Sequence, residues 1–318
     1  MPLYPAPCAD SPGRCSPFPV PPSMTTVDYR PPRPGRVGRG ILFMCAAVVL
    51  FACMNALVKL LSNQYDAVQL VWARILSHFV FILLIFVPRS RFAVLRTKRP
   101  GTQLIRSTLQ LCSTACFFSA LHYVPLAEAI SISFLTPLIV TLLAAHMLGE
   151  AISARRLVTI LVGLCGVLIV IRPGSEVFQW ASLLILVSAF FYASYQVLTR
   201  RVAPVDAPET SAFYSALVGT LVTSLAVPFF WRTPDSAFDI AVMASLGVLG
   251  GLGHYLVARA LFNAPANIAS PFQYFQLVVG VILGYLMFGD VPTMYTWIGS
   301  AVIVASGLYI GWNESRKT

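Results

Sequence analysis

Long stretches without a charged residue recur along almost the whole chain. Nine of them cover residues 41–58, 107–127, 129–149, 157–171, 177–199, 210–231, 240–258, 260–289 and 291–313, and a tenth apolar segment, 68–88, is interrupted only by Arg74. An α-helix rises about 1.5 Å per residue, so about 20 apolar residues cross a hydrocarbon core about 30 Å thick. The sequence therefore predicts an all-α integral membrane protein with ten transmembrane helices.

The amino-acid composition supports the same class of fold. Charged residues make up 11% of the chain and hydrophobic residues 57%, with a mean hydropathy of +0.77. Soluble domains contain about 25% charged residues. This chain has too little polar surface to cover itself in water.

The formal net charge of +10 follows a pattern along the chain. If the N-terminus is cytoplasmic and the chain crosses the membrane ten times, every Lys and Arg lies in a cytoplasmic segment except Lys59, Arg74, Arg172 and Arg232. Cytoplasmic loops of membrane proteins carry such an excess of Lys and Arg. The charge therefore indicates an inner (plasma) membrane protein with both termini in the cytoplasm, and nucleic acid is not expected as a partner.

Residues 1–39 form a Pro- and Arg-rich segment without an apolar run. Such a segment cannot offset its ordering entropy by burial, and we expect a disordered cytoplasmic tail. It also lacks the apolar middle region of a signal peptide. Two interpretations remain open: a genuine tail, or upstream sequence translated ahead of a true start at Met24. Residues 313–318 are expected to form a short cytoplasmic tail.

The chain contains an internal repeat. Shifting the sequence by 140 residues aligns Ala120, Leu121, Pro125, Ala129, Phe134 and 148–150 with Ala260, Leu261, Pro265, Ala269, Tyr274 and 288–290. Each half contains five predicted helices, and an odd number of crossings forces the second half to enter the bilayer from the opposite side. The sequence predicts two inverted five-helix repeats, residues 40–172 and 177–312.

Several short motifs are spread over these halves. They are Trp72-Ala73-Arg74, Pro125 and Ala127 followed by Thr136-Pro137-Leu138, Leu148-Gly149-Glu150, Ala264-Pro265, Pro271-Phe272-Gln273-Tyr274 and Gly289-Asp290. With these motifs the chain resembles the ten-helix transporters of the drug/metabolite transporter superfamily that have two EamA domains. The resemblance covers residues 40–312 and implies a transporter fold. Relatives with similar motifs move riboflavin, S-adenosylmethionine, opine-type metallophores or amino acids, so it implies a class of cargo only.

Two cations are candidates for binding that cargo. A charge at the middle of a bilayer costs about 2.5 to 3.5 kcal/mol on insertion scales, so an intramembrane cation indicates a functional site. Asn55 and Lys59 share one face of the first helix, and Trp72 and Arg74 lie in the second. We predict that these four residues contact the substrate. The alternative is that Lys59 and Arg74 extend to the lipid headgroups.

The remaining substrate-binding candidates are aromatic or polar. Tyr192 and Tyr195, next to Gln196, either stack on a planar ligand or pack against neighbouring helices. His254 lies in a glycine-rich helix and either lines a cavity or packs. Gln273 and Tyr274 belong to a polar segment that should face the protein interior, because lipid offers no hydrogen bonds. Pro137 and Pro271 are expected to bend their helices.

Glu128 is the candidate for ion coupling. A carboxylate at a helix N-terminus is stabilised by the helix dipole, which is the structural interpretation. Partial burial could instead poise it to carry a proton. The seven cysteines contain no C-x-x-C pair and the four histidines are scattered, so we expect neither a metal nor a cofactor.

Together these features predict a secondary transporter of a small organic metabolite, anionic or zwitterionic, that works by alternating access. The expected partners are the small-molecule substrate, the lipid bilayer and a coupling proton, with a second copy of the chain as a further candidate. No G-x-x-x-x-G-K-[ST] motif is present, so ATP hydrolysis is not expected. The alternative is a membrane enzyme acting on a lipid, which would need clustered His, Asp or nucleophilic groups.

Overall fold

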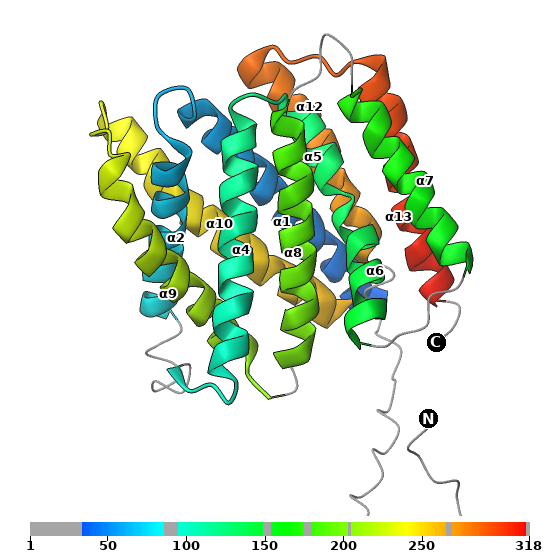
Figure 1. Cartoon of the computed structure of the whole chain (residues 1–318), viewed down its shortest axis with the longest axis horizontal. Helices are drawn as coiled ribbons and strands as arrows, with labels where there is room; N and C mark the ends of the chain where they lie inside the picture. Colours follow the sequence, from blue (N-terminus) through cyan, green and yellow to red (C-terminus); the bar gives the residue numbers. More distant parts are fainter. Residues whose placement is uncertain are drawn as a thin grey trace, which may run out of the picture.

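The computed structural model describes residues 34–85, 95–148, 154–173, 180–202, 205–264 and 269–315. All regular secondary structure in these residues is helical (Figure 1). The helices are α1 (Pro34–Leu61), α2 (Ala67–Ile85), α4 (Pro100–Leu121), α5 (Leu126–Ser133), α6 (Thr136–Leu148), α7 (Ala154–Ile171), α8 (Ala181–Val202), α9 (Pro208–Ala226), η2 (Val227–Phe229), α10 (Ala237–Asn263), η3 (Ser270–Tyr274), α12 (Phe275–Phe288) and α13 (Met294–Ser315). Residues 1–33 of the predicted tail lie outside the described residues.

The length and hydrophobicity of the helices confirm the prediction of a membrane protein. Seven helical segments are long and apolar enough to cross a bilayer; they belong to α1, α2, α4, α5 with α6, α8, α9 and α10. Three shorter apolar helices cover Leu157–Ile171, Phe272–Phe288 and Met294–Tyr309. Large apolar side chains such as Leu84, Leu225 and Phe229 are exposed on the outside of the bundle, as expected for a surface that faces lipid.

The helices pack in a reciprocal pattern. α1 packs on α10 and α4 packs on α8, while α2 packs on α9 and α7 packs on α13. Matching the helices of the two halves in order pairs α1 with α8, α2 with α9, α4 with α10, α5 and α6 with α12, and α7 with α13. Under this matching the α1–α10 contact becomes the α8–α4 contact, while the α2–α9 and α7–α13 contacts are each unchanged. A two-fold axis between the halves produces this pattern, which supports the predicted inverted repeat. In Figure 1 the start of α1 and the end of α13 lie at the same end of the bundle.

Two membrane segments are broken at equivalent places. α5 ends at Ser133 and α6 begins at Thr136, next to Pro137, while the 3-10 turn η3 contains Pro271 and precedes α12. Proline lacks a backbone N–H and disfavours continuation of a regular helix. The bends expected at these two prolines are therefore present.

Glycines allow α10 to approach α2 and α1 closely. A Cβ atom at Gly247 would collide with the Ser77 hydroxyl and the His78 backbone nitrogen, and one at Gly253 would lie 2.6 Å from the Phe51 ring. The amide of Gly247 donates a hydrogen bond to the Ser77 hydroxyl at 3.0 Å. Small residues at such positions are the usual basis of helix contact in lipid.

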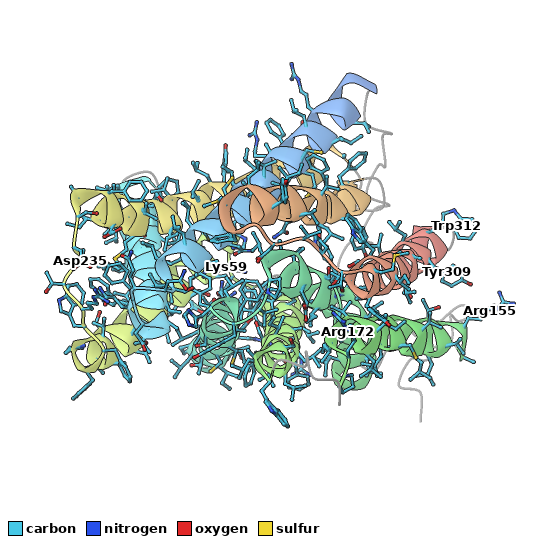
Figure 2. The ribbon with its side chains drawn as sticks, turned by 90° about the horizontal axis from the view of Figure 1, so that it is seen from above. Lys59, Arg155, Arg172, Asp235, Tyr309 and Trp312 are labelled. Carbon is cyan, nitrogen blue, oxygen red and sulfur yellow. The ribbon has the colours of Figure 1, made fainter. Side chains whose placement is uncertain are left out.

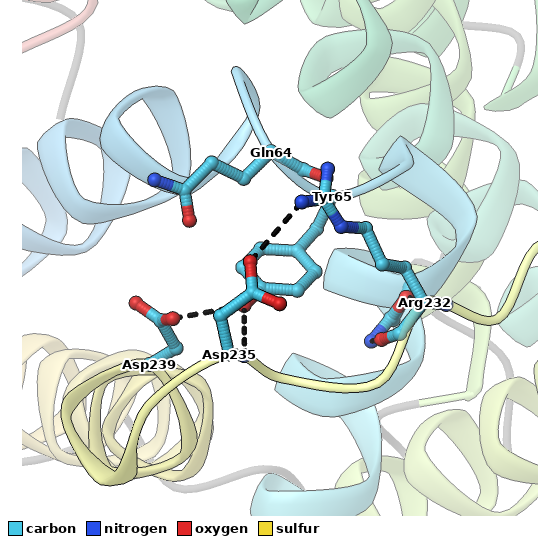
Figure 3. Close-up of polar contacts among 6 residues, drawn as sticks. Gln64, Tyr65, Arg232, Asp235 and Asp239 are labelled. Atoms are coloured by element: carbon cyan, nitrogen blue, oxygen red, sulfur yellow. Dashed lines mark hydrogen bonds and ion pairs between the residues drawn. The ribbon is translucent and has the colours of Figure 1, made fainter.

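A polar network at one end of the bundle joins the loop after α1 to the segment before α10 (Figure 3). The Tyr65 hydroxyl donates to Asp239 Oδ2 at 2.8 Å and accepts from the Asp235 amide at 2.9 Å. Arg232 pairs with Asp235 at 3.1 Å and donates to the Gln64 carbonyl oxygen at 3.0 Å. The network ties the first half of the chain to the second.

Candidate substrate-binding site

Arg74 lies at a junction of three helices. From α2, its Nη1 donates to Thr114 Oγ1 on α4 at 3.2 Å, and its Nε lies 3.4 Å from Met54 Sδ on α1. Its Cζ lies 5.6 Å from the centre of the Phe118 ring. Among the described residues, no carboxylate forms an ion pair with Arg74. Within the described part of the chain its charge is therefore stabilised by neutral groups and an aromatic ring, and an anionic ligand could supply a counter-charge.

Two tyrosines on α8 lie within the electrostatic reach of Arg74. The rings of Tyr192 and Tyr195 stack with centroids 5.6 Å apart and planes 19° apart. Both tyrosines lie close enough to Arg74 to interact with its charge. The tyrosines therefore bring a flat aromatic surface close to an unpaired cation.

Two histidines complete the group that we name the Arg74 cluster: Arg74, His78, Tyr192, Tyr195 and His254. The ring of His254 on α10 stacks on His78 with centroids 6.5 Å apart, and Arg74 acts electrostatically on both. The close approach of α10 to α2 places His254 there. The sequence missed His78, although its spacing of four residues from Arg74 puts it on the same helix face.

Lys59 does not join this cluster. Its Nζ lies 2.6 Å from Asp290 Oδ2, donates to the Val124 carbonyl oxygen at 3.1 Å and lies 5.0 Å from the centre of the Phe288 ring. Lys59 follows Met54, which contacts Arg74, by five residues, or about 7.5 Å along α1. Viewed from above, Lys59 is near the middle of the molecule (Figure 2). In this structure its charge is compensated by a residue of the other half.

The other predicted residues have separate surroundings. Asn55 is buried on α1 next to Met54, and Gln196 is half-buried beside Tyr195. Trp72 faces α9, where its Nε1 donates to Ser224 Oγ at 3.0 Å and its ring meets Trp231 edge-on at 5.6 Å.

Gln273 and Tyr274 lie in η3, beside the break in the fourth segment. The Tyr274 ring meets Phe134 at 4.9 Å, and its hydroxyl fills the space that a side chain at Gly307 of α13 would need. Gln273 is half-buried in the same turn. These two residues therefore form a second location, at the two helix breaks.

Glu128 occupies the first turn of α5, as expected for an acid at a helix N-terminus. Ser182 Oγ donates to its Oε1 at 3.4 Å, and the charges of Arg172 and Lys59 act on it. The side chain is half-buried. The coupling role of Glu128 stays a prediction.

Arg106 is a buried residue whose position the sequence did not reveal. It was counted among the cytoplasmic charges, yet it is only 1% exposed on α4. Its guanidinium donates to Thr199 Oγ1 at 3.2 Å, to Ser215 Oγ at 2.8 Å and to the Ser211 carbonyl oxygen, and its Cζ lies 4.9 Å from the Tyr195 ring centre. Arg106 therefore fixes the far side of the tyrosine stack. The sequence signal for the burial of Arg106 was its position six residues after Pro100, where α4 begins.

An acid outside the membrane segments supports Arg106. Gln103 accepts from Arg106 Nε at 3.1 Å and donates to Asp206 Oδ2 at 2.8 Å. Asp206 also accepts from Thr97 Oγ1 at 2.5 Å and from the Lys98 amide at 3.0 Å. Burial alone would raise the pKa of Asp206, but these hydrogen bonds hold it below its ordinary value. No group of three or more His, Cys, Asp or Glu in the described part of the chain is arranged to hold a metal ion.

The fold and its two halves match a known family. Residues 38–172 and residues 179–312 each match the EamA-like transporter family. The chain therefore belongs to that family, which confirms the resemblance seen in the sequence. It is a multi-pass membrane transporter, and the alternative of a membrane enzyme is wrong.

Curated relatives cover nearly the whole chain. A riboflavin transporter of Vibrio cholerae is 29% identical over 285 residues, which are 88% of this chain and 95% of the relative. An S-adenosylmethionine uptake transporter of Rickettsia bellii is 27% identical, covering 87% of this chain and 94% of its own length. A pseudopaline exporter of Pseudomonas aeruginosa is 28% identical, covering 84% and 94%. A solved crystal structure shares the fold, with a TM-score of 0.64 at 20% identity over 88% of this chain and 99% of its own.

Proposed function

We propose that this chain is a secondary transporter that moves a small anionic or zwitterionic metabolite across the cell inner membrane by alternating access. The observation that carries this proposal is Arg74, a cation within a membrane segment that no carboxylate of the described residues pairs with. Relatives named as transporters of riboflavin, S-adenosylmethionine and pseudopaline support a metabolite as cargo.

The energetics of Arg74 favour an anionic cargo. A charge in a membrane segment is unfavourable without a counter-charge, and the described residues supply none for Arg74, so an anionic group of the cargo would be stabilised there. Hydrogen bonds to charged groups contribute about 1.5 to 3 kcal/mol, against about 1 kcal/mol for neutral ones. A carboxylate held by the planar fork of Arg74 would also be fixed in orientation.

The packing of the helices supports alternating access. Two halves related by an axis in the membrane plane can exchange roles, so one arrangement opens to each side in turn. Lys59 and Asp290, which come from different halves, join them at one end in this structure. We place both termini in the cytoplasm, since that orientation puts most Lys and Arg inside, and we assign proton coupling to Glu128.

Transport by purified protein tests the proposal. Liposomes containing equal amounts of each variant are offered a mixture of carboxylate-bearing metabolites, including S-adenosylmethionine, with riboflavin added, and the moved species are identified by mass spectrometry. We expect Arg74→Gln to abolish transport and Arg74→Lys to restore it only partly, because lysine lacks the bidentate fork. Arg155→Gln, which changes an exposed arginine at the edge of the molecule (Figure 2), is the control and should transport normally. Normal transport by Arg74→Gln would contradict the proposal.

A further inference from the structure

Gln110 carries a buried hydrogen-bonding atom that nothing in the described residues satisfies. Its Oε1 has no hydrogen-bond partner, a property shared in the described part of the chain only with Thr220 Oγ1 on α9. Buried polar groups are nearly always paired, because leaving one unpaired is unfavourable. An unpaired acceptor therefore needs an explanation, and hydrogen bonding to a ligand is one.

The position of Gln110 on α4 points to the Arg74 cluster. Gln110, Thr114 and Phe118 follow one another at intervals of four residues and so share one helix face. Thr114 and Phe118 both contact the Arg74 guanidinium. Gln110 is therefore one turn away from that contact, on the same face.

The packing of α4 on α8 sets the level of Gln110 relative to the tyrosines. Ser113 and Ser188 are hydrogen-bonded at 3.0 Å, and Arg106 donates to Thr199 at 3.2 Å. The two helices thus run antiparallel, and Gln110 falls between these contacts. That level on α8 is the level of Tyr192 and Tyr195. Along α4, Gln110 lies between Thr114, which contacts Arg74, and Arg106, whose Cζ lies near the Tyr195 ring.

We propose that Gln110 determines the specificity of the transport site: its side-chain oxygen accepts a hydrogen bond from an N–H group of the cargo. This inference rests on the proposed function and specifies the cargo class. The stacked tyrosines fit a flat ring, Arg74 fits an anionic or electron-rich edge, and Gln110 requires a donor near that edge. The cargo is therefore a flat nitrogen heterocycle that bears an N–H donor beside a carbonyl or carboxylate group.

A merely structural Gln110 and a ligand-binding one predict different results. Replacing a buried unpaired amide by an apolar side chain of similar length removes its desolvation penalty, so the empty protein should become equally or more heat-stable. If Gln110 also binds cargo, the same replacement should weaken binding. Stability and binding would then change in opposite directions, which a structural role does not predict.

The experiment uses the full chain in detergent and in liposomes, with riboflavin, N3-methylriboflavin and S-adenosylmethionine as probes. Riboflavin has a flat ring with an imide N–H between two carbonyls, and methylation at N3 removes that donor. Riboflavin carries no charge and therefore tests the flat ring and the donor without the carboxylate. We expect it to raise the unfolding temperature of the wild-type protein and to be transported, with N3-methylriboflavin about tenfold weaker. In Gln110→Met the unfolding temperature without probe should match or exceed wild type, and the two flavins should no longer be distinguished.

Thr220→Val is the matched control, because it removes the other unpaired atom with little change in shape. It should keep the full discrimination between the two flavins. The wild-type comparison of the flavins tests the donor even if Gln110→Met does not fold. Discrimination that persists in Gln110→Met, or a wild-type protein that riboflavin does not stabilise, would overturn the inference. If Arg74→Gln does not transport but Gln110→Met behaves like wild type, only the role of Gln110 is wrong. If Arg74→Gln still transports, the proposed function itself is wrong.

Discussion

Phe134 and Tyr274, which align when the two halves of the sequence are superposed, touch each other in the structure. Their ring centroids are 4.9 Å apart, with planes inclined by 67°. Two positions that a two-fold axis exchanges can meet only where the axis passes between them. The axis that relates the halves is therefore expected to run between the break after Ser133 and the turn η3, where both membrane segments lose regular helical geometry.

The Lys59–Asp290 ion pair is predicted to stabilise the empty protein. Asp290→Asn removes the counter-charge from a lysine whose side chain is 13% exposed, so we expect a loss of about 1.5 to 3 kcal/mol in the free energy of unfolding. Thermal unfolding in detergent measures this loss. The control is Asp235→Asn, which breaks an exposed ion pair with Arg232 and should cost about 1 kcal/mol or less. Equal losses in the free energy of unfolding would show that the Lys59–Asp290 pair stabilises the protein no more than the exposed Arg232–Asp235 pair does.

Arg106→Met should destabilise the protein strongly. The substitution leaves the Gln103 side-chain oxygen without its donor, which costs about 1 to 3 kcal/mol for an unpaired buried group, and it also removes the hydrogen bonds to Thr199, Ser211 and Ser215. Chemical unfolding monitored by tryptophan fluorescence provides the measurement. Arg155→Met, at the exposed start of α7, serves as the comparison. A stable Arg106→Met protein would mean that water or a rearranged neighbour replaces the lost hydrogen bonds.

Asp206 should make stability depend on pH. Because hydrogen bonds lower its pKa in the folded state, its contribution is fully present above the ordinary aspartate pKa of about 3.9 and is lost as the pH falls through the folded value. The difference in unfolding temperature between wild type and Asp206→Asn should therefore be largest at neutral pH and shrink below pH 4. Measurements at pH 7 and pH 3 test this, and a constant difference would refute it.

Gly247→Ala tests the close approach of α10 to α2. A Cβ atom there collides with the Ser77 hydroxyl and the backbone of His78, so we expect a loss of about 1 to 3 kcal/mol from overpacking and reduced transport, since the collision displaces His254. Gly101→Ala has open space around the new methyl group and should be neutral or slightly stabilising. Thermal unfolding and transport are measured on both variants. A Gly247→Ala protein as stable and active as Gly101→Ala would contradict the packing argument.

Much of the fold could be predicted from the sequence, because each span is bounded by charges and the two breaks coincide with prolines. Arg74 was identifiable as the single charge in its segment. The partner of Lys59 was not, because Asp290 lies 231 residues away and only the fold brings them together. Gln110 carried no signal at all: one neutral amide in an apolar stretch becomes informative only when its lack of a hydrogen-bond partner is visible.

The short apolar stretch of α7 affects the surrounding lipid. Leu157–Ile171 lies between two arginines and spans about 23 Å at 1.5 Å per residue, less than the roughly 30 Å of an average hydrocarbon core. The mismatch is therefore concentrated on the flank of the molecule that α7 occupies. A bilayer meets such a mismatch by local thinning, by flanking side chains that reach the headgroups or by pairing of proteins, at a cost of fractions of a kcal/mol per Å. Two copies that met along this flank would share one zone of mismatch, so the membrane itself would favour pairing there, and more strongly in bilayers of long-chain lipids.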